Sequence, residues 1–283
     1  MRVSNQKRAI VTIAIGLDPS YRYGIRSLKG YAAKVGAELI VIRKPVVAID
    51  GLSDDRHIAW LQKFHALQYA NKFESILYVD ADILITPKAP DIFQLMRSQS
   101  ATCAMYDEGH LGRGHYVDSL QKVICQPVPE NWSGSYFNAG VIYLCKSTLV
   151  QKFRPEDIKA VMLGGVPCPE QTLLNYLINV FHIEVVPLDR SYNFMEERSV
   201  DRSGRLDAHF IHYAGYSFRE TKKAKRVTVM RSDFLELFRG DVAIAKRILL
   251  VLRDWLQGAC WSLKKKYMRI VRRTSLNHSM QNR

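Results

Sequence analysis

Two aspartates two positions apart, Asp80 and Asp82, interrupt the apolar run YVDADILI at residues 78–85. A strand interior would have to desolvate each carboxylate, so the run must reach the surface there or hold a positive charge. Two carboxylates that close repel each other unless a cation lies between them. A hard divalent ion such as Mg²⁺ or Mn²⁺ suits them, and phosphate oxygens often complete its coordination. Two solvated acids at a strand end would give the same pattern.

The elements that must position these aspartates alternate along the chain. Apolar runs predict strands at 10–16, 37–43, 75–85, 101–106, 140–145, 183–188 and 208–213, and helical patterns occur at about 21–35, 58–72, 91–98 and 170–180. This order predicts βαβ units and a largely parallel sheet, and no G-x-G-x-x-G follows the first strand. Asp80 and Asp82 fall near the end of the third strand, where open sheets bind ligands, and in extended geometry both side chains point the same way. The polar stretch 107–135 is long for a connection, which favours a functional loop.

Charge is distributed unevenly along the chain. The net charge is +14, and residues 219–283 hold 17 Lys and Arg against 5 Asp and Glu. From Phe238 to Ile270, apolar residues recur every three or four positions with basic residues between them, which predicts an amphipathic helical tail. The charge excess favours an anionic membrane surface as its partner, while a helix packed on the body is the alternative. No nucleic-acid motif accompanies the charge, so we expect no nucleic-acid partner.

Cysteine usage and the N-terminus bear on the compartment. The five cysteines contain no C-x-x-C pair, which argues against a disulfide framework or a zinc site and favours a cytoplasmic setting. The start MRVSNQKRAIVTIAIGL imitates a signal peptide, but no A-x-A-like site follows and the run also suits a first strand. No uncharged stretch reaches the roughly 18 residues of a spanning helix. We therefore expect a cytoplasmic protein, peripheral on the inner membrane face.

Four ordered segments carry a family resemblance. YVDADILI, followed by KAPDIFQL, resembles the D-x-D region of GT-A nucleotide-sugar glycosyltransferases. YFNAGVIYL (136–144), EQTLLN (170–175) and HYAG (212–215) are similar to the later motifs of glycosyltransferase family 8. The resemblance spans residues from about 10 to 215. It implies an α/β GT-A fold over residues 1–218, with a Rossmann-like mixed, mostly parallel sheet flanked by helices, followed by the basic tail at 219–283.

The resemblance also implies a metal centre. The donor would be a UDP-sugar whose diphosphate is bridged by a divalent metal held by Asp80, Asp82 and His212. The metal would neutralise the diphosphate and stabilise charge on the departing UDP as a Lewis acid. A histidine ligand favours Mn²⁺ over Mg²⁺. His209 lies three residues before His212 on the same strand, so it faces the other way.

Further donor-site residues follow from the same resemblance. Tyr21 would lie against the uracil, although a buried tyrosine of the first helical turn is the alternative. Lys63 would lie near the donor phosphate or sugar, although a lysine on a helix is often simply solvated. Asn138, Glu170 and Gln171 match positions that contact the donor sugar in a transfer with retention of configuration.

The chemistry of the side chains limits the roles that Gln171 and Glu170 can have. Gln171 would lie near the reacting carbon, and because an amide is a poor nucleophile it would act by orientation and charge stabilisation. Glu170 would hold sugar hydroxyls, but the family usually has aspartate there.

After HYAG the usual K-P-W is replaced by YSFRETKK, where Lys222 or Lys223 is a candidate for binding phosphate.

The resulting hypothesis is a metal-dependent hexosyltransferase that moves a sugar from a UDP-sugar to a saccharide or lipid-linked acceptor in polysaccharide biosynthesis, with the 107–135 loop shaping the acceptor site. One alternative is a non-catalytic nucleotide-binding protein on the same scaffold, because fold does not imply function. Another is a D-x-D phosphohydrolase that resembles the haloacid dehalogenase pattern. That pattern places the motif on the first strand of its domain, whereas here the motif follows the third.

Overall fold

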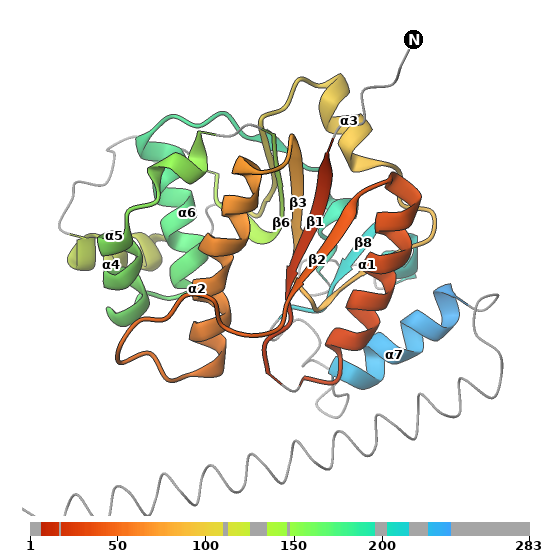
Figure 1. The fold of residues 1–283 in the computed structure, drawn as a ribbon, viewed down its shortest axis with the longest axis horizontal. Coiled ribbons are helices and arrows are strands. Elements are labelled where there is room, and N and C mark those ends of the chain that lie inside the picture. The colour runs from red at the N-terminus through yellow and green to blue at the C-terminus, as the bar shows by residue number, and fades with distance from the viewer. Residues whose placement is uncertain are drawn as a thin grey trace, which may run out of the picture.

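A computed structural model describes residues 7–16, 18–109, 113–124, 135–145, 148–195, 203–214 and 226–238 (Figure 1). A central six-stranded sheet has the order β2-β1-β3-β6-β5-β7. Its strands are β1 (Arg8–Ile13), β2 (Glu38–Ile42), β3 (Ser75–Val79), β5 (Cys103–Asp107), β6 (Phe137–Leu144) and β7 (Val186–Pro187). The pairs β1–β2, β1–β3 and β5–β7 are parallel, whereas β6 runs antiparallel to β3 and β5. The predicted mixed, mostly parallel sheet is confirmed.

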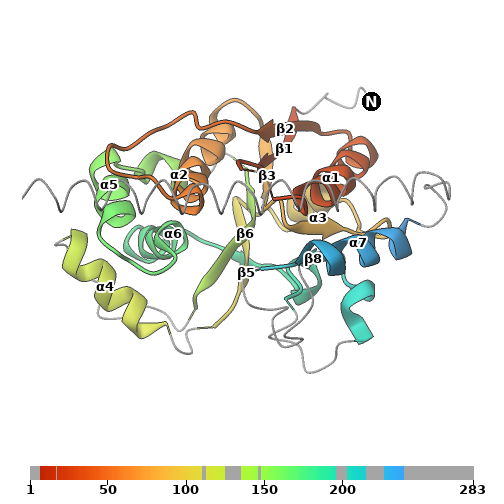
Figure 2. The same ribbon diagram turned by 90° about the horizontal axis from the view of Figure 1, so that it is seen from below.

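Helices cover both faces of this sheet (Figures 1 and 2). They are α1 (Tyr21–Val35), α2 (Asp55–Leu67), α3 (Ile92–Ser98), α4 (Gly114–Ile124), α5 (Pro155–Leu163), α6 (Pro169–Val180) and α7 (Arg226–Leu237). Alternate residues of each strand point to opposite faces, so Ile76 and Tyr78 join the core under α2 and α6, while Leu77 and Val79 join the core under α1 and α3. The sheet therefore separates two apolar cores.

Local signals explain where the helices around the site begin and end. The Asp54 side chain accepts hydrogen bonds from the backbone of Arg56 and His57, which caps α2. α1 ends at Gly36, which takes the left-handed conformation with φ +63° that glycine adopts without strain. α6 begins with a proline at its first turn, which places Glu170 and Gln171 in that same turn.

The expected strand over 75–85 is divided in the structure. β3 ends at Val79, a turn closed by the Ile83 N–H to Asp80 carbonyl bond (3.1 Å) follows, and β4 (Ile83–Ile85) begins a different sheet. β4 pairs antiparallel with β8 (Phe210–His212), with Ile83 opposite His212. The single-strand prediction is wrong, because both halves are fully buried and apolar, and the short segment between them resembles a strand that carries two polar residues.

Two other expectations differ from the structure. The stretch 107–135, expected as a loop, contains α4, whose Val117, Leu120 and Ile124 are buried at helical spacing. Residues 125–134 of that stretch lie outside the described part. The strand expected at 183–188 is reduced to β7, with two residues.

α7 lies at the start of the predicted basic tail and packs on the body. The Phe234 ring lies 5.4 Å from the Tyr23 ring of α1, and Met230 is fully buried. The Asp233 carboxylate accepts a hydrogen bond from the Tyr213 hydroxyl (2.6 Å), directly after β8. The amphipathic stripe beyond Phe238 lies outside the described residues. Of the helices that the structure describes, none has the length and hydropathy needed to cross a membrane.

Candidate active site

The turn that carries the two aspartates is fixed by three neighbouring elements. The Asp80 N–H donates to the Gly140 carbonyl of β6 (2.8 Å), and the Tyr213 N–H donates to the Asp82 carbonyl (3.0 Å). Gly24 of α1 lies so close that a side chain there would overlap the Ala81 carbonyl. The turn therefore has little freedom. Both aspartates directly follow the end of β3, as predicted, but they lie in a turn and not in the expected extended geometry.

Asp80, Asp82 and His212 form a cluster suited to a metal ion. Each offers one ligand atom, and these atoms all lie within 4.8 Å of one another. The His212 Nε2 is 3.5 Å from Asp82 Oδ1 and 3.9 Å from Asp80 Oδ2. Two carboxylates and an imidazole around one point are a donor set that a divalent cation accepts.

A directional hydrogen-bond chain orients the His212 imidazole. The Gly140 N–H donates to Asn138 Oδ1 (2.8 Å), which identifies that atom as the amide oxygen. Asn193 must then donate to the same oxygen through Nδ2 (2.8 Å), so Asn193 Oδ1 faces His212 Nδ1 at 2.8 Å. His212 Nδ1 therefore donates to Asn193 Oδ1, and Nε2 is the ring nitrogen that faces the two aspartates, the position from which it could bind a metal. A side chain at Gly140 would overlap the imidazole.

Lys63 of α2 is buried in the same site. Its Nζ lies 3.3 Å from Asp80 Oδ1 and 3.3 Å from Glu170 Oε1, and it donates to the Ala139 carbonyl (3.0 Å). The Lys63 side chain is 4% exposed, so the solvated alternative does not hold. Burial alone would lower the pKa of Lys63, but the two carboxylates outweigh it and raise that pKa.

Glu170 lies deeper than Asp80 and is less well paired. Burial raises the pKa of the Glu170 carboxyl, and the Lys63 ammonium offsets part of that rise. Its Oε2 is buried and has no hydrogen-bond partner in the described part of the chain. A buried oxygen in that state can accept a hydrogen bond from a water or from a bound group.

A second cation reaches the site from α7. Arg226 NH1 lies 2.9 Å from Asp82 Oδ2 and 3.6 Å from Asp18 Oδ2. Burial by itself would raise the pKa of Asp82, but the Arg226 guanidinium and His212 outweigh it and hold that pKa at about 2. Tyr21 is half-buried, and its pKa is raised by burial first and then by the nearby Asp82 and Asp18 carboxylates. Tyr21 therefore lies beside the metal cluster.

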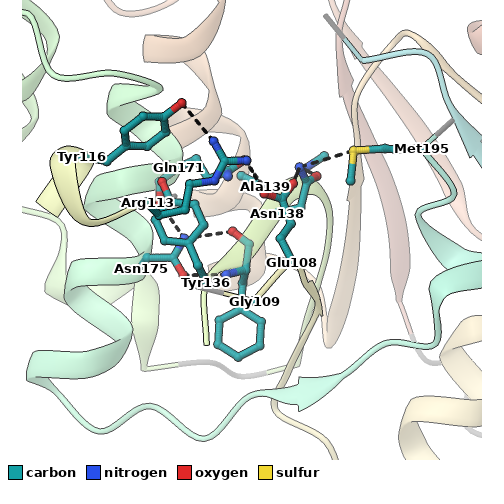
Figure 3. A network of polar contacts seen from close by, with 12 residues as sticks. Glu108, Gly109, Arg113, Tyr116, Tyr136, Asn138, Ala139, Gln171, Asn175 and Met195 are labelled. Carbon is teal, nitrogen blue, oxygen red and sulfur yellow. Dashed lines mark hydrogen bonds and ion pairs between the residues drawn. The ribbon is translucent and has the colours of Figure 1, made fainter. Parts of the chain in front are cut away.

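A polar network extends from Asn138 to α4 (Figure 3). The Asn138 amide donates to Glu108, whose side chain is 2% exposed, and Arg113 NH2 pairs with Glu108 Oε2 at 2.6 Å. The Arg113 guanidinium also donates to the Tyr116 hydroxyl (2.9 Å) and lies 5.3 Å from the centre of the Tyr136 ring. This network ties the start of α4 to the ends of β5 and β6.

Gln171 and Asn175 of α6 bond to the backbone of β6 (Figure 3). Gln171 Oε1 accepts from the Ala139 N–H (3.1 Å), which leaves its amide nitrogen as the end that can reach a ligand. Asn175 exchanges two hydrogen bonds with Phe137, at 2.7 Å and 2.8 Å. These bonds fix the first turn of α6, and with it Glu170, against the sheet.

The structure thus gathers the predicted site residues at one edge of the sheet: Tyr21, Lys63, Asp80, Asp82, Asn138, Glu170, Gln171 and His212. His209 lies outside the metal cluster, with its ring 4.9 Å from that of Tyr192. Sequence reasoning missed Glu108, Asn193 and Arg226, while Lys222 and Lys223 lie outside the described residues. Only the local position of Glu108, at the end of β5, could have drawn attention to it.

Two solved structures share the fold. A glycosyltransferase involved in the glycosylation of the major capsid of PBCV-1 matches with a TM-score of 0.50 and 15% identity, over 80% of this chain and 98% of that one. The WbbM bifunctional glycosyltransferase matches with a TM-score of 0.51 and 11% identity, over 89% of this chain and 52% of that one. At these identities the likeness concerns the fold, which is GT-A.

Sequence comparison identifies the family. Lipopolysaccharide 1,2-glucosyltransferase of Escherichia coli is 27% identical over 163 residues, which are 52% of this chain and 44% of that protein. The match therefore spans less than half of the curated relative. The model of the glycosyl transferase family 8 matches residues 51–218, a range that contains both aspartates, the α6 turn and His212. The chain belongs to glycosyltransferase family 8.

Proposed function

We propose that this glycosyltransferase is metal-dependent and moves a hexose from a UDP-sugar to a saccharide or lipid-linked acceptor, with retention of anomeric configuration. The observation that carries the proposal is the cluster of Asp80, Asp82 and His212, in which His212 Nε2 faces the two carboxylates. The name of the Escherichia coli relative, a lipopolysaccharide glucosyltransferase, supports a hexose and a glycolipid or polysaccharide acceptor.

Asp80, Asp82 and His212 would hold the metal, and the imidazole ligand favours Mn²⁺ over Mg²⁺. When bound, this ion would supply Lewis-acid stabilisation of the diphosphate leaving group. The chain's own contribution is to hold the ligands still, through the bonds of the turn and the amide chain from Gly140 to His212. Both ends of the Asn138 amide are engaged in that network, so we assign Asn138 to positioning.

The remaining residues would bind the donor. Tyr21, beside Asp82, would stack on the uracil, as aromatic side chains do with bases. The unpartnered Glu170 Oε2 would accept a hydrogen bond from a sugar hydroxyl, and Lys63 would keep that carboxylate charged. The free amide end of Gln171 would lie near the reacting carbon and act by orientation and charge stabilisation.

The acceptor site and the cellular location are proposed from the 107–135 stretch and from the basic tail. The 107–135 stretch, with α4 held by Arg113 and Glu108, would border the acceptor site. The protein would be cytoplasmic, and its basic stripe beyond Phe238 would bind anionic lipid on the inner face of the membrane. Family membership gives no support to the phosphohydrolase alternative. An assay of UDP release from a UDP-sugar tests the non-catalytic alternative.

Isothermal titration of the full chain with UDP and a panel of UDP-sugars, in Mn²⁺ and then in EDTA, tests the function. We expect UDP to bind with Mn²⁺ and to lose most of its affinity in EDTA, and Asp82→Asn to abolish the metal-dependent part. Asp207→Asn removes a carboxylate whose side chain is 83% exposed and should bind like the wild type. Equal binding with and without metal, or unchanged binding by Asp82→Asn, would refute the metal assignment.

Binding alone does not separate a transferase from a nucleotide-binding relative. Release of UDP from the preferred UDP-sugar, with and without saccharide acceptors, makes that distinction. Metal-dependent UDP release that Gln171→Ala slows while UDP still binds would support transfer. Tight binding with no release under any acceptor condition would favour the non-catalytic alternative.

A further inference from the structure

Arg226 forms an ion pair with Asp82, one of the two aspartates that would bind the metal. Its NH1 lies 2.9 Å from Asp82 Oδ2, while Asp82 Oδ1 lies 3.5 Å from the His212 ring nitrogen. One carboxylate therefore faces a permanent cation on one side and the metal cluster on the other. Arginine stays protonated at any physiological pH, so this charge cannot be removed by titration.

The structure holds Arg226 there through the packing of α7. The Tyr213 hydroxyl, one residue after His212, donates to Asp233 Oδ2 at 2.6 Å, and Arg205 pairs with the same carboxylate at 2.9 Å. Phe234 packs on Tyr23 of α1, and α7 lies alongside α1 in Figures 1 and 2. α7 is thus attached to the segment that supplies a metal ligand, and Arg226 begins that helix.

Electrostatics gives this placement a consequence. A divalent ion at the cluster and the Arg226 guanidinium would share Asp82 and would repel each other at short range. A dianionic diphosphate would attract both cations and remove that repulsion. Arg226 therefore weakens binding of the metal alone. It strengthens binding of the metal and a diphosphate together.

We propose that Arg226 couples the metal to the donor: it competes with the metal for Asp82 in the absence of nucleotide and pairs with the donor diphosphate when both are bound. The second half rests on the proposed function, whereas the competition for Asp82 does not. Removing the Arg226 charge should therefore strengthen binding of the metal alone and weaken binding of the nucleotide to the metal-loaded site. A residue that only binds phosphate, or only stabilises the fold, would not give that pair of effects.

The test measures two affinities in the full chain. Mn²⁺ binding without nucleotide is followed by electron paramagnetic resonance, and UDP binding at saturating Mn²⁺ by calorimetry. For Arg226→Gln we expect Mn²⁺ alone to bind about tenfold tighter and UDP about tenfold weaker, within the usual range of coupling between sites. Arg226→Lys keeps the charge and should stay closer to the wild type in both.

Arg26→Gln is the matched control. Arg26 lies over the Phe234 ring at 5.5 Å, so this variant removes a positive charge from the same α1–α7 contact without touching a carboxylate of the site. It should leave both affinities unchanged. If Arg226→Gln lowers the thermal unfolding midpoint, Arg226→Met, which retains an apolar stem, provides the same two measurements.

Several outcomes would overturn the proposal. Mn²⁺ binding by Arg226→Gln that is no tighter than in the wild type would exclude competition at Asp82. Unchanged UDP affinity at saturating Mn²⁺ would exclude the pairing with diphosphate. If the wild type binds Mn²⁺ but not UDP, the proposed function fails, and the Mn²⁺ titration still decides whether Arg226 and the metal compete.

Discussion

Lys63→Met should strongly destabilise the chain, because it removes the cation between two buried or half-buried carboxylates. The Lys63 Nζ is 3.3 Å from both Asp80 and Glu170, and the Glu170 side chain is 7% exposed with Oε2 already unpartnered. Removing one member of a buried ion pair leaves an uncompensated charge, which costs about 3–5 kcal/mol. We expect a loss of that size in the free energy of unfolding.

Urea unfolding at neutral pH in EDTA measures this loss, with the slope of the transition checked for a change in the unfolding reaction. Lys29→Met removes an exposed lysine of α1 and should change the free energy by no more than about 0.5 kcal/mol. Adding Glu170→Gln to Lys63→Met removes the orphaned charge and should restore part of the stability. A loss below about 1 kcal/mol for Lys63→Met would refute the reasoning, because Glu170 would then be effectively solvated.

The stability loss caused by Lys63→Met should depend on pH in a definite direction. The pKa of Glu170 is raised in the folded chain, first by burial, so the folded state holds its proton more tightly than the unfolded state. The destabilisation from its charge is therefore present above the raised pKa and is relieved as the pH falls through it. Without Lys63 that pKa rises further, so the deficit of Lys63→Met should shrink as the pH is lowered. A deficit that grows on acidification would contradict this sign.

Three further predictions concern the metal site and the C-terminal segment. Gly140→Ala should weaken Mn²⁺ binding by at least tenfold, since its methyl group would displace the His212 ring; unchanged affinity in a Mn²⁺ titration would contradict the placement of that ring. Phe234→Ala should cost about 3–5 kcal/mol in urea unfolding, because the ring is 1% exposed; a loss under about 1 kcal/mol would mean that α7 is not packed on the body. A chain that ends after Phe238 should keep its thermal midpoint and lose binding to anionic vesicles; retained, salt-sensitive binding would place the membrane contact elsewhere.

Sequence reasoning located the two aspartates of the metal cluster because two general rules suffice for them. Apolar runs identify buried strands, and ligands gather beyond the carboxyl ends of such strands in an open sheet. The family motifs then supplied His212 and the α6 turn, which no local pattern connects to Asp80. The division of 75–85 into β3 and β4 was missed, because a turn between two fully buried strands leaves the apolar pattern almost intact.

The residues that the sequence did not reveal act through contacts between distant segments. Asn193 has its role only because it lies between Asn138 and His212. Arg226 is one basic residue among many in a charged segment, and only the packing of α7 places it on Asp82. Such roles depend on tertiary geometry, which spacing along the chain does not encode.

The pairing of β4 with β8 also sets an order of events during synthesis. The parallel unit of β1, β2 and β3 comes from the first part of the chain and can form early, but β4 has no partner until β8 leaves the ribosome. Until then the nascent chain carries both aspartates without the histidine that completes their donor set. Three-ligand metal binding therefore requires synthesis through β8, and a product that stops before β8 would fold part of its sheet without gaining the full metal centre.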